Sequence, residues 1–214
     1  MISVGKRVLW GVGTARTMRP HWALRELSIP YETKPILSRS GETQTPEFSL
    51  INPRQKIPVL QDGDFTIAES GAIVSYLAEI YGNGSRRLIP SGERQRAQWL
   101  EWNLFIAMEL DATSLYIVRR HADLRHIYGD APAAVQSSKA YFLKQLGHVD
   151  QTLRKGRFFL MGDEFTTADI LLTTCLTWAI SLDVPVHDSC RTYLERLTAR
   201  EAYQAALVAN APRP

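Results

Sequence analysis

The first part of the chain, up to Gly82, alternates short apolar runs with longer amphipathic ones. Extended patterns are found at residues 7–10, 31–36, 57–60 and 65–67, and helical patterns at residues 15–27 and 69–81. The order is β-α-β followed by β-β-α, which predicts a small mixed α/β domain. Residues 61–64 are typical of a hairpin turn, because glycine accepts a positive φ and aspartate tolerates it. The polar stretch at residues 38–50 predicts a loop with at most a short helix.

The pattern becomes helical almost throughout after residue 88. Apolar residues follow steps of three and four along a helix predicted at residues 93–120, namely Trp99, Trp102, Phe105, Ile106 and Leu110. A second helix repeats this behaviour between Tyr141 and Leu153. The glycine-rich segment at residues 82–85 separates the two patterns. We therefore expect two domains, a thioredoxin-like domain at residues 1–82 and an all-helical bundle at residues 89–214.

Composition and charge narrow the functional classes. The 214 residues are 45% hydrophobic, which is enough for a full core, and the net charge of +3 is spread along the chain. A nucleic-acid partner is therefore not expected. No apolar run reaches the roughly 18 residues of a membrane helix, and the start of the chain lacks a signal-peptide pattern, so we expect a cytoplasmic protein. The two cysteines, Cys175 and Cys190, predict neither a disulfide scaffold nor a metal site.

One helix start in the second half has a complete capping signal. Thr166 and Asp169 stand at the two positions of a capping box, in which each side chain bonds the free backbone N–H of the other residue. A long apolar segment follows directly. We expect these two residues to act in folding and stability rather than in chemistry.

The first predicted binding feature is at Pro58, which opens an extended run. A proline cannot donate to the ladder there, so it belongs at an edge or at a strand's first residue. If the Ile57–Pro58 bond is cis, the backbone of Ile57 turns outward and offers its N–H and C=O to a peptide-like ligand.

A second binding feature begins at Glu69 and Ser70, where a helix opens directly after a strand. Its free N–H groups and the positive end of its dipole suit a carboxylate. The Ser70 hydroxyl also suits a carboxylate, and the Glu69 carboxylate suits an ammonium group. These are the two ends of a zwitterionic amino acid.

The pairing of these two features resembles the glutathione transferase family, and the resemblance covers almost the whole chain. It implies the two-domain glutathione transferase fold, glutathione as co-substrate, a small electrophilic second substrate and a homodimer. The γ-glutamyl end of glutathione would lie at Glu69 and Ser70, and its backbone at Ile57 and Pro58. The Thr166–Asp169 box resembles that of the family's buried central helix. No metal or nucleotide cofactor is expected.

The resemblance also implies a group that stabilises the thiolate of glutathione, since a free thiol is mostly protonated at neutral pH. Thr14 follows the first strand, where theta, delta and nu-like members carry a serine or threonine. Thr17 is the competing hydroxyl. Arg16 stands where beta-class members have a cysteine, a departure that disfavours that class, and it could act electrostatically. The alternative is that Thr14 merely caps the first helix.

Several choices stay open from the sequence. Lys56 could pair with the glycyl carboxylate of glutathione, and Arg39, Gln44 and Gln55 are weaker candidates for the same role. The leading activity is conjugation of glutathione to electrophiles. A disulfide reductase or peroxidase, a dehalogenase and an isomerase need the same thiolate and remain alternatives. A non-enzymatic glutathione-binding or scaffold protein on the same fold is the third class.

Overall fold

A computed structural model of the protein describes residues 6–212. Contacts between residues divide the chain into two compact units. The first contains the chain up to Arg87 together with the segment from Ala199 on, and the second is Leu88–Thr198. The sequence pattern assigns residues 89–214 to the helical domain. The segment from Ala199 on instead groups with the first unit, because its helix packs on the first helix of the chain.

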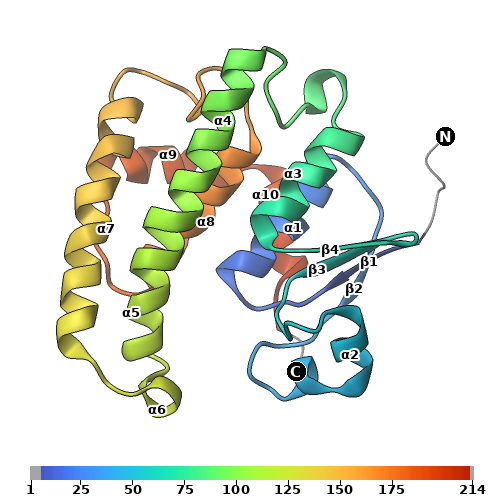
Figure 1. The fold of residues 1–214 in the computed structure, drawn as a ribbon. Coiled ribbons are helices and arrows are strands. Elements are labelled where there is room, and N and C mark those ends of the chain that lie inside the picture. The colour runs from blue at the N-terminus through green and yellow to red at the C-terminus, as the bar shows by residue number, and fades with distance from the viewer. Residues whose placement is uncertain (1–5, 213–214) are drawn as a thin grey trace. The chain divides into compact units, whose positions relative to one another are not determined.

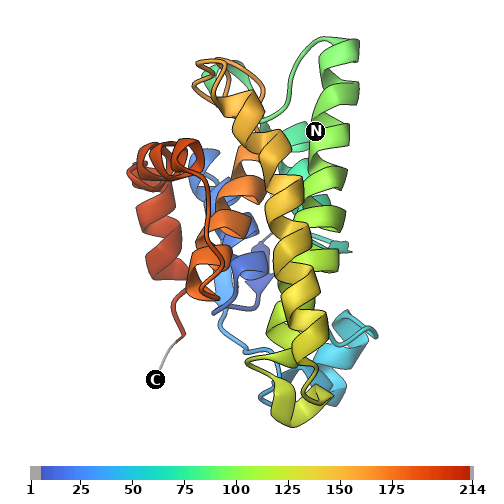
Figure 2. The same ribbon diagram turned by 90° about the vertical axis from the view of Figure 1, so that its left-hand side faces the viewer.

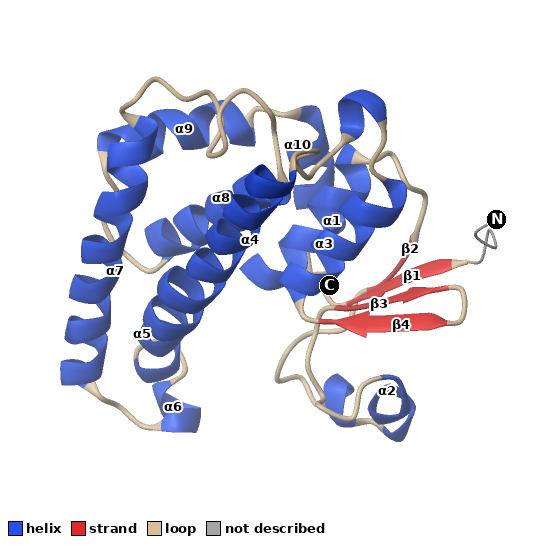
Figure 3. Ribbon diagram, turned by 45° about the horizontal axis from the view of Figure 1, so that its top comes forward, coloured by secondary structure: helices blue, strands red, loops and turns tan. Residues whose placement is uncertain are grey.

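The first unit is built on a four-stranded mixed sheet (Figure 3). Its strands are β1 (Arg7–Trp10), β2 (Glu32–Lys34), β3 (Val59–Asp62) and β4 (Phe65–Ala68), in the order β2-β1-β3-β4. β1 is parallel to β2, whereas β3 is antiparallel to β1 and β4. The predicted β3 strand is displaced by two residues and begins after Pro58. The hairpin turn is confirmed, with Gly63 at a φ of 64°.

Helices complete the first unit (Figures 1 and 2). They are α1 (Ala15–Glu26), α2 (Pro46–Ile51), α3 (Ser70–Tyr81) and α10 (Glu201–Ala209), with short 3-10 turns η1 (Glu42–Gln44) and η2 (Gly84–Arg86). α1 packs against both α3 and α10. Trp22 of α1 is fully buried and meets the ring of Tyr203 edge-on at 4.9 Å. Arg200 donates two hydrogen bonds to the Glu26 carboxylate, at 2.7 and 2.8 Å, and so ties α10 to the end of α1.

Charged and phenolic groups are paired with one another where β1 begins and β3 ends. The buried Asp62 carboxylate accepts hydrogen bonds from Tyr76 at 3.0 Å and from Tyr81. Arg7 lies 3.2 Å from the same carboxylate and over the ring of Tyr81. The polar groups at this end of the sheet therefore bond one another, and we interpret the cluster as structural.

The second unit is helical, as the pattern predicts. Its helices are α4 (Glu93–Phe105), η3 (Ile106–Leu115), α5 (Tyr116–His121), α6 (Arg125–Tyr128), α7 (Pro132–Leu153), α8 (Thr167–Ser181) and α9 (Asp188–Thr198). The helix predicted at residues 93–120 is continuous over α4, η3 and α5, but η3 is wound as a π-helix. Within residues 6–212 no helix is both long and apolar enough to cross a bilayer. The two-part fold class expected from the sequence is confirmed.

The core of the second unit is α8, which is buried along nearly its whole length. Its predicted capping box is present. The fully buried Asp169 carboxylate accepts bonds from the backbone N–H groups of Thr166 and Leu160, both at 2.8 Å, and from the Tyr193 hydroxyl at 2.7 Å. Burial raises the pKa of Asp169, and these donors oppose the rise. The box thus ties the start of α8 to α9 and to the segment before α8.

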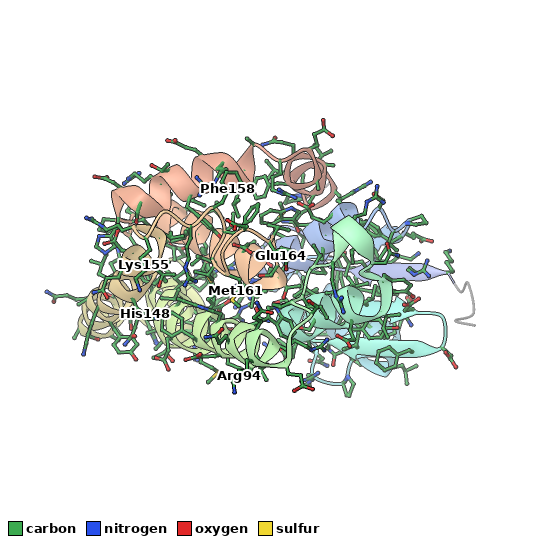
Figure 4. All side chains as sticks on the ribbon, turned by 90° about the horizontal axis from the view of Figure 1, so that it is seen from above. Arg94, His148, Lys155, Phe158, Met161 and Glu164 are labelled. Carbon is green, nitrogen blue, oxygen red and sulfur yellow. The ribbon has the colours of Figure 1, made fainter. Side chains whose placement is uncertain are left out.

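Aromatic contacts link the helices of the second unit at its surface (Figure 4). His148 of α7 stacks on Trp102 of α4, with ring centroids 5.1 Å apart. Phe158, in the connection between α7 and α8, lies under the guanidinium of Arg196 from α9 at 4.5 Å. These contacts join α4 to α7 and the α7–α8 connection to α9.

Candidate functional site

Sheet register brings the three predicted site segments to one end of the sheet. Trp10 pairs with Val59, and Val59 pairs with Ala68. Neighbouring strands lie about 4.8 Å apart, so the three residues form one short row. The turn after Trp10, the Ile57–Pro58 segment before Val59 and the Glu69–Ser70 pair after Ala68 therefore leave the sheet side by side.

The Ile57–Pro58 peptide bond is cis. Ile57 also lies directly against the turn that follows β1. Gly11 has a φ of +108°, and a Cβ atom at Gly11 would lie 2.6 Å from the Cβ atom of Ile57. Within residues 6–212 neither the N–H nor the C=O of Ile57 has a backbone hydrogen-bond partner. A peptide-like ligand can therefore pair with this backbone in the manner of an added strand.

Thr14 is the N-cap residue of α1, as one of the sequence interpretations holds. Its Oγ1 atom accepts a hydrogen bond from the Thr17 N–H at 3.0 Å, and its own N–H donates to Thr17 Oγ1 at 2.9 Å. The two residues form a capping box in which a threonine replaces the usual acid or amide. Capping does not use the hydroxyl proton of Thr14, whose side chain is half-buried. The cap and a donor function are therefore compatible.

Thr17 differs from Thr14 in burial and in its partners. Its side chain is fully buried, and Oγ1 lies 2.7 Å from Oδ1 of Asn210, at the end of α10. Thr17 Oγ1 is also 3.0 Å from Thr14 Oγ1. Arg16 lies on the first turn of α1 and is half-buried.

Glu69 and Ser70 stand at the start of α3, as predicted. Glu69 has a φ of 71° and a ψ of 118°, an unfavourable conformation for a residue with a side chain, at a cost of order 1–3 kcal/mol. Its exposed carboxylate pairs with Arg54 at 3.3 Å. Ser70 is buried, and its hydroxyl oxygen accepts a hydrogen bond from Nη1 of the buried Arg19 at 3.0 Å. The Ser70 proton remains available to a second acceptor.

A buried histidine supports the turn after β1. The Nε2 atom of His21 is 3.2 Å from the Gly11 carbonyl oxygen, and Nδ1 is 2.8 Å from the Tyr31 hydroxyl. A carbonyl can only accept, so Nε2 carries the proton and Nδ1 accepts from Tyr31. Burial lowers the pKa of His21 to about 4. The ring is therefore neutral at neutral pH.

The remaining predicted residues lie at the surface. Lys56 is exposed, and its backbone carbonyl accepts a bond from the Asn52 side chain at 2.8 Å. Gln55 is exposed at a φ of 52° and donates to Ser49 at 3.1 Å. Gln44 and Arg39 are exposed in the connection between β2 and β3. Glycyl-carboxylate binding by any of them stays a prediction.

Sequence reasoning missed three residues that contact the site segments, namely Arg19, Arg54 and Asn210. Arg19 meets Ser70 across 51 positions of sequence, and Asn210 meets Thr17 across 193. The local sequence pattern does not predict contacts between residues so far apart in the sequence. The one available signal was the guanidinium of Arg19 in a helical run, Thr17 to Leu24, that is buried throughout.

Comparison with known proteins identifies the family. The model of the glutathione S-transferase N-terminal domain matches residues 6–79, and that of the C-terminal domain matches residues 132–204. Glutathione S-transferase F10 of Arabidopsis thaliana is 35% identical, over 73% of each chain. The glutathione S-transferase-like protein gedE of Aspergillus terreus is 28% identical, over 96% of each chain.

A solved structure agrees over nearly the whole length. The crystal structure of a glutathione transferase from Methylococcus capsulatus strain Bath superposes with a TM-score of 0.80 at 29% identity, covering 95% of this chain and 98% of that chain. The chain belongs to the glutathione S-transferase family. The family expected from Ile57–Pro58 and Glu69–Ser70 is therefore confirmed.

Proposed function

We propose that the protein is a glutathione transferase that conjugates the thiolate of glutathione to small electrophilic substrates. The observation that carries the proposal is the shared sheet end, where Thr14, Ile57 and Ser70 stand on three adjacent segments. An extended tripeptide laid along this end would place its backbone at Ile57. Its γ-glutamyl end would lie at the start of α3, and its sulfur would lie toward the turn at Thr14.

The γ-glutamyl group has complementary charges at the start of α3. We assign its carboxylate to the Ser70 hydroxyl and the free N–H groups of the first helical turn. Arg19 already donates to Ser70 Oγ, so the Ser70 proton points to another acceptor. We assign the ammonium group to the Glu69 carboxylate, which the positive φ of that residue holds at the helix start. Gln55 and Lys56 are candidates for the glycyl carboxylate.

The reaction requires an ionised thiol. We propose that Thr14 donates its hydroxyl proton in a hydrogen bond to the sulfur, while the free N–H groups at the start of α1 add a favourable field. Both effects lower the thiol pKa, and the released proton passes to solvent. The thiolate then attacks the electrophile, a carbon–sulfur bond forms, and the leaving group departs with its electron pair or the electrophile takes up a proton. Arg16 is a candidate for a further electrostatic contribution.

The proposal includes a cytoplasmic homodimer that uses no metal or nucleotide cofactor. Three large apolar side chains, spaced four residues apart, support a subunit interface on the second unit. Leu100, Leu104 and Met108 are 50, 55 and 55% exposed along α4 and η3. Four-residue spacing places them on one helix face. A second copy of the chain would bury this stripe.

Calorimetric titration with glutathione and with its disulfide tests the proposed function. We expect the wild type to bind glutathione and Ser70→Ala to bind it about tenfold or more weakly, because a hydrogen bond to a charged group is worth about 1.5–3 kcal/mol. The matched control is Ser75→Ala. This substitution removes a hydroxyl from the same helix that, among the described residues, bonds only the Gly71 carbonyl, at 2.9 Å.

The possible results separate the functional classes. If the wild type binds neither form of glutathione, the proposed function is wrong. Binding without turnover of any electrophile would favour the glutathione-binding scaffold. Equal losses of glutathione affinity in Ser70→Ala and Ser75→Ala would show that Ser70 does not bind the carboxylate. They would not contradict the proposed transferase activity.

A further inference from the structure

Asn210 joins the far end of the chain to the turn that carries Thr14. It ends α10, is 9% exposed, and belongs to the same compact unit as α1. We propose that Asn210 is a positioning residue that holds Thr14 in the geometry needed to stabilise the thiolate. The inference rests on the proposed function, because it concerns the same sulfur.

The contacts of Asn210 with the turn use every polar group that it can offer there. The Gly13 N–H donates to the Asn210 carbonyl oxygen at 2.8 Å and to its Oδ1 atom at 3.2 Å. Thr17 Oγ1 donates to the same Oδ1 at 2.7 Å, and Nδ2 donates to the Thr14 carbonyl at 3.2 Å. The opposite amide orientation would set an N–H group against the Gly13 N–H and an oxygen against the Thr14 carbonyl. The network therefore fixes the amide orientation.

These contacts also determine which hydroxyl has a proton to donate. The Thr14 carbonyl already accepts from the Met18 N–H at 3.0 Å and from Asn210 Nδ2. Thr17 Oγ1 also lies 2.9 Å from the Thr14 carbonyl oxygen, but these two donors use both lone pairs of that oxygen, so we assign the Thr17 proton to the closer acceptor, Asn210 Oδ1 at 2.7 Å. Thr17 is thereby committed to the C-terminal segment. The proton of Thr14 can go to Thr17 Oγ1 at 3.0 Å, or to a sulfur that competes for it.

The anchor that Asn210 provides is a firm one. Its helix is held to α1 by the two hydrogen bonds between Arg200 and Glu26. Gly13 has a φ of +83° and is exposed. Pro212 and Leu37 both lie against it, because a Cβ atom at Gly13 would be 3.2 Å from Pro212 Cγ and 3.3 Å from Leu37 Cδ2. Residues at the other end of the chain therefore share in holding the turn that carries Thr14.

The test compares Asn210→Ala and Asn210→Asp with Val208→Ala, which changes a 78% exposed residue on the same helix. Steady-state conjugation with a chromogenic electrophile gives kcat and the KM for glutathione. Ultraviolet absorbance of the bound thiolate against pH gives the pKa of the thiol. For Asn210→Ala we expect kcat to fall about tenfold or more and the thiol pKa to rise, with KM within about twofold. Ser70 and Ile57 are untouched, so binding is retained.

Asn210→Asp keeps the acceptor for Gly13 and Thr17 but sets a negative oxygen against the Thr14 carbonyl. We expect it to fold, to bind glutathione and to raise the thiol pKa, which keeps the test decisive even if Asn210→Ala does not fold. An active wild type with an unchanged kcat and thiol pKa in both variants would overturn the inference and leave the proposed function intact. A wild type that neither binds nor conjugates glutathione would overturn both.

Discussion

Two helices of this protein begin with a threonine capping box, and the two boxes differ in burial and in their hydrogen-bond partners. At the start of α8, Asp169 is fully buried and accepts hydrogen bonds from two backbone N–H groups and from the Tyr193 hydroxyl. At the start of α1, Thr14 is half-buried and Thr17 takes the position of the acid. The first box is closed on all sides. The second stands at the sheet end where the ligand is proposed to bind.

The difference lies in the residue at the third helical position. An ionised aspartate can only accept hydrogen bonds. Four donors already bond the Asp169 carboxylate, so the α8 box has no hydrogen-bonding group left for a ligand. A threonine both donates and accepts. Thr17 therefore accepts from the Thr14 N–H, donates to Asn210 and still leaves Thr14 a proton for another acceptor. The capping pattern alone does not tell a purely structural box from one that can also bind a ligand. The two boxes differ in the exposure of their residues and in whether a hydroxyl proton is available to a ligand.

The largest expected effect is on stability at the α8 box. Asp169→Ala would leave the N–H groups of Leu160 and Thr166 and the Tyr193 hydroxyl buried without an acceptor. Each unsatisfied group costs roughly 1–3 kcal/mol, so we expect a loss of about 4 kcal/mol in the free energy of unfolding. Urea denaturation measures it, with the exposed Asp163→Ala as control. Comparable losses of unfolding free energy in both variants would contradict the stabilising role of Asp169.

Much of this comparison could be predicted from the sequence. The order of strands and helices in the first domain, the Glu69–Ser70 pair and the Thr166–Asp169 box all follow from local patterns, and the structure contains each of them. Local patterns work here because caps and turns are made by residues a few positions apart. They also left open whether Thr14 caps a helix or donates to a ligand.

The rest depends on contacts between distant residues. The apolar face of α10 resembles that of any surface helix, and no pattern says that it packs on α1. Arg19 and Asn210 reach the site across 51 and up to 197 positions. The π-helical winding of η3 is also invisible in an apolar spacing of three and four. Tertiary packing decides all these features.

The second expected effect is a pH dependence of stability, and it arises at His21, which lies in α1 and contacts the turn before it. The unfolded chain binds a proton at His21 with a pKa of about 6.5, and the folded protein with a pKa of about 4. The unfolded state therefore binds more protons between these values, so stability rises with pH over that window and is lost as pH falls through it. The contribution is about 3 kcal/mol at most.

A comparison with His21→Gln isolates this contribution. We expect the difference in unfolding free energy between the wild type and His21→Gln to change with pH between about 4 and 6.5, and to be flat above that range. The matched control is His126→Gln, which alters an exposed histidine of α6. Parallel curves for the wild type and His21→Gln would show that His21 has the same pKa in the folded and unfolded states, which contradicts the expectation.

The smallest effect on folding, and the sharpest on chemistry, is expected at Thr14. Thr14→Ala removes a cap worth about 1 kcal/mol, but it also removes the proposed hydrogen-bond donor to sulfur. We expect kcat for conjugation to fall about a hundredfold, because loss of one preorganised donor to a developing anion has costs of that order. Thr14→Ser keeps both the cap and the proton, so its kcat and thiol pKa should stay close to those of the wild type. If Thr14→Ala loses only the stability of a cap, the two boxes are alike in function, and the thiolate must be stabilised by Arg16 or by the helix start itself.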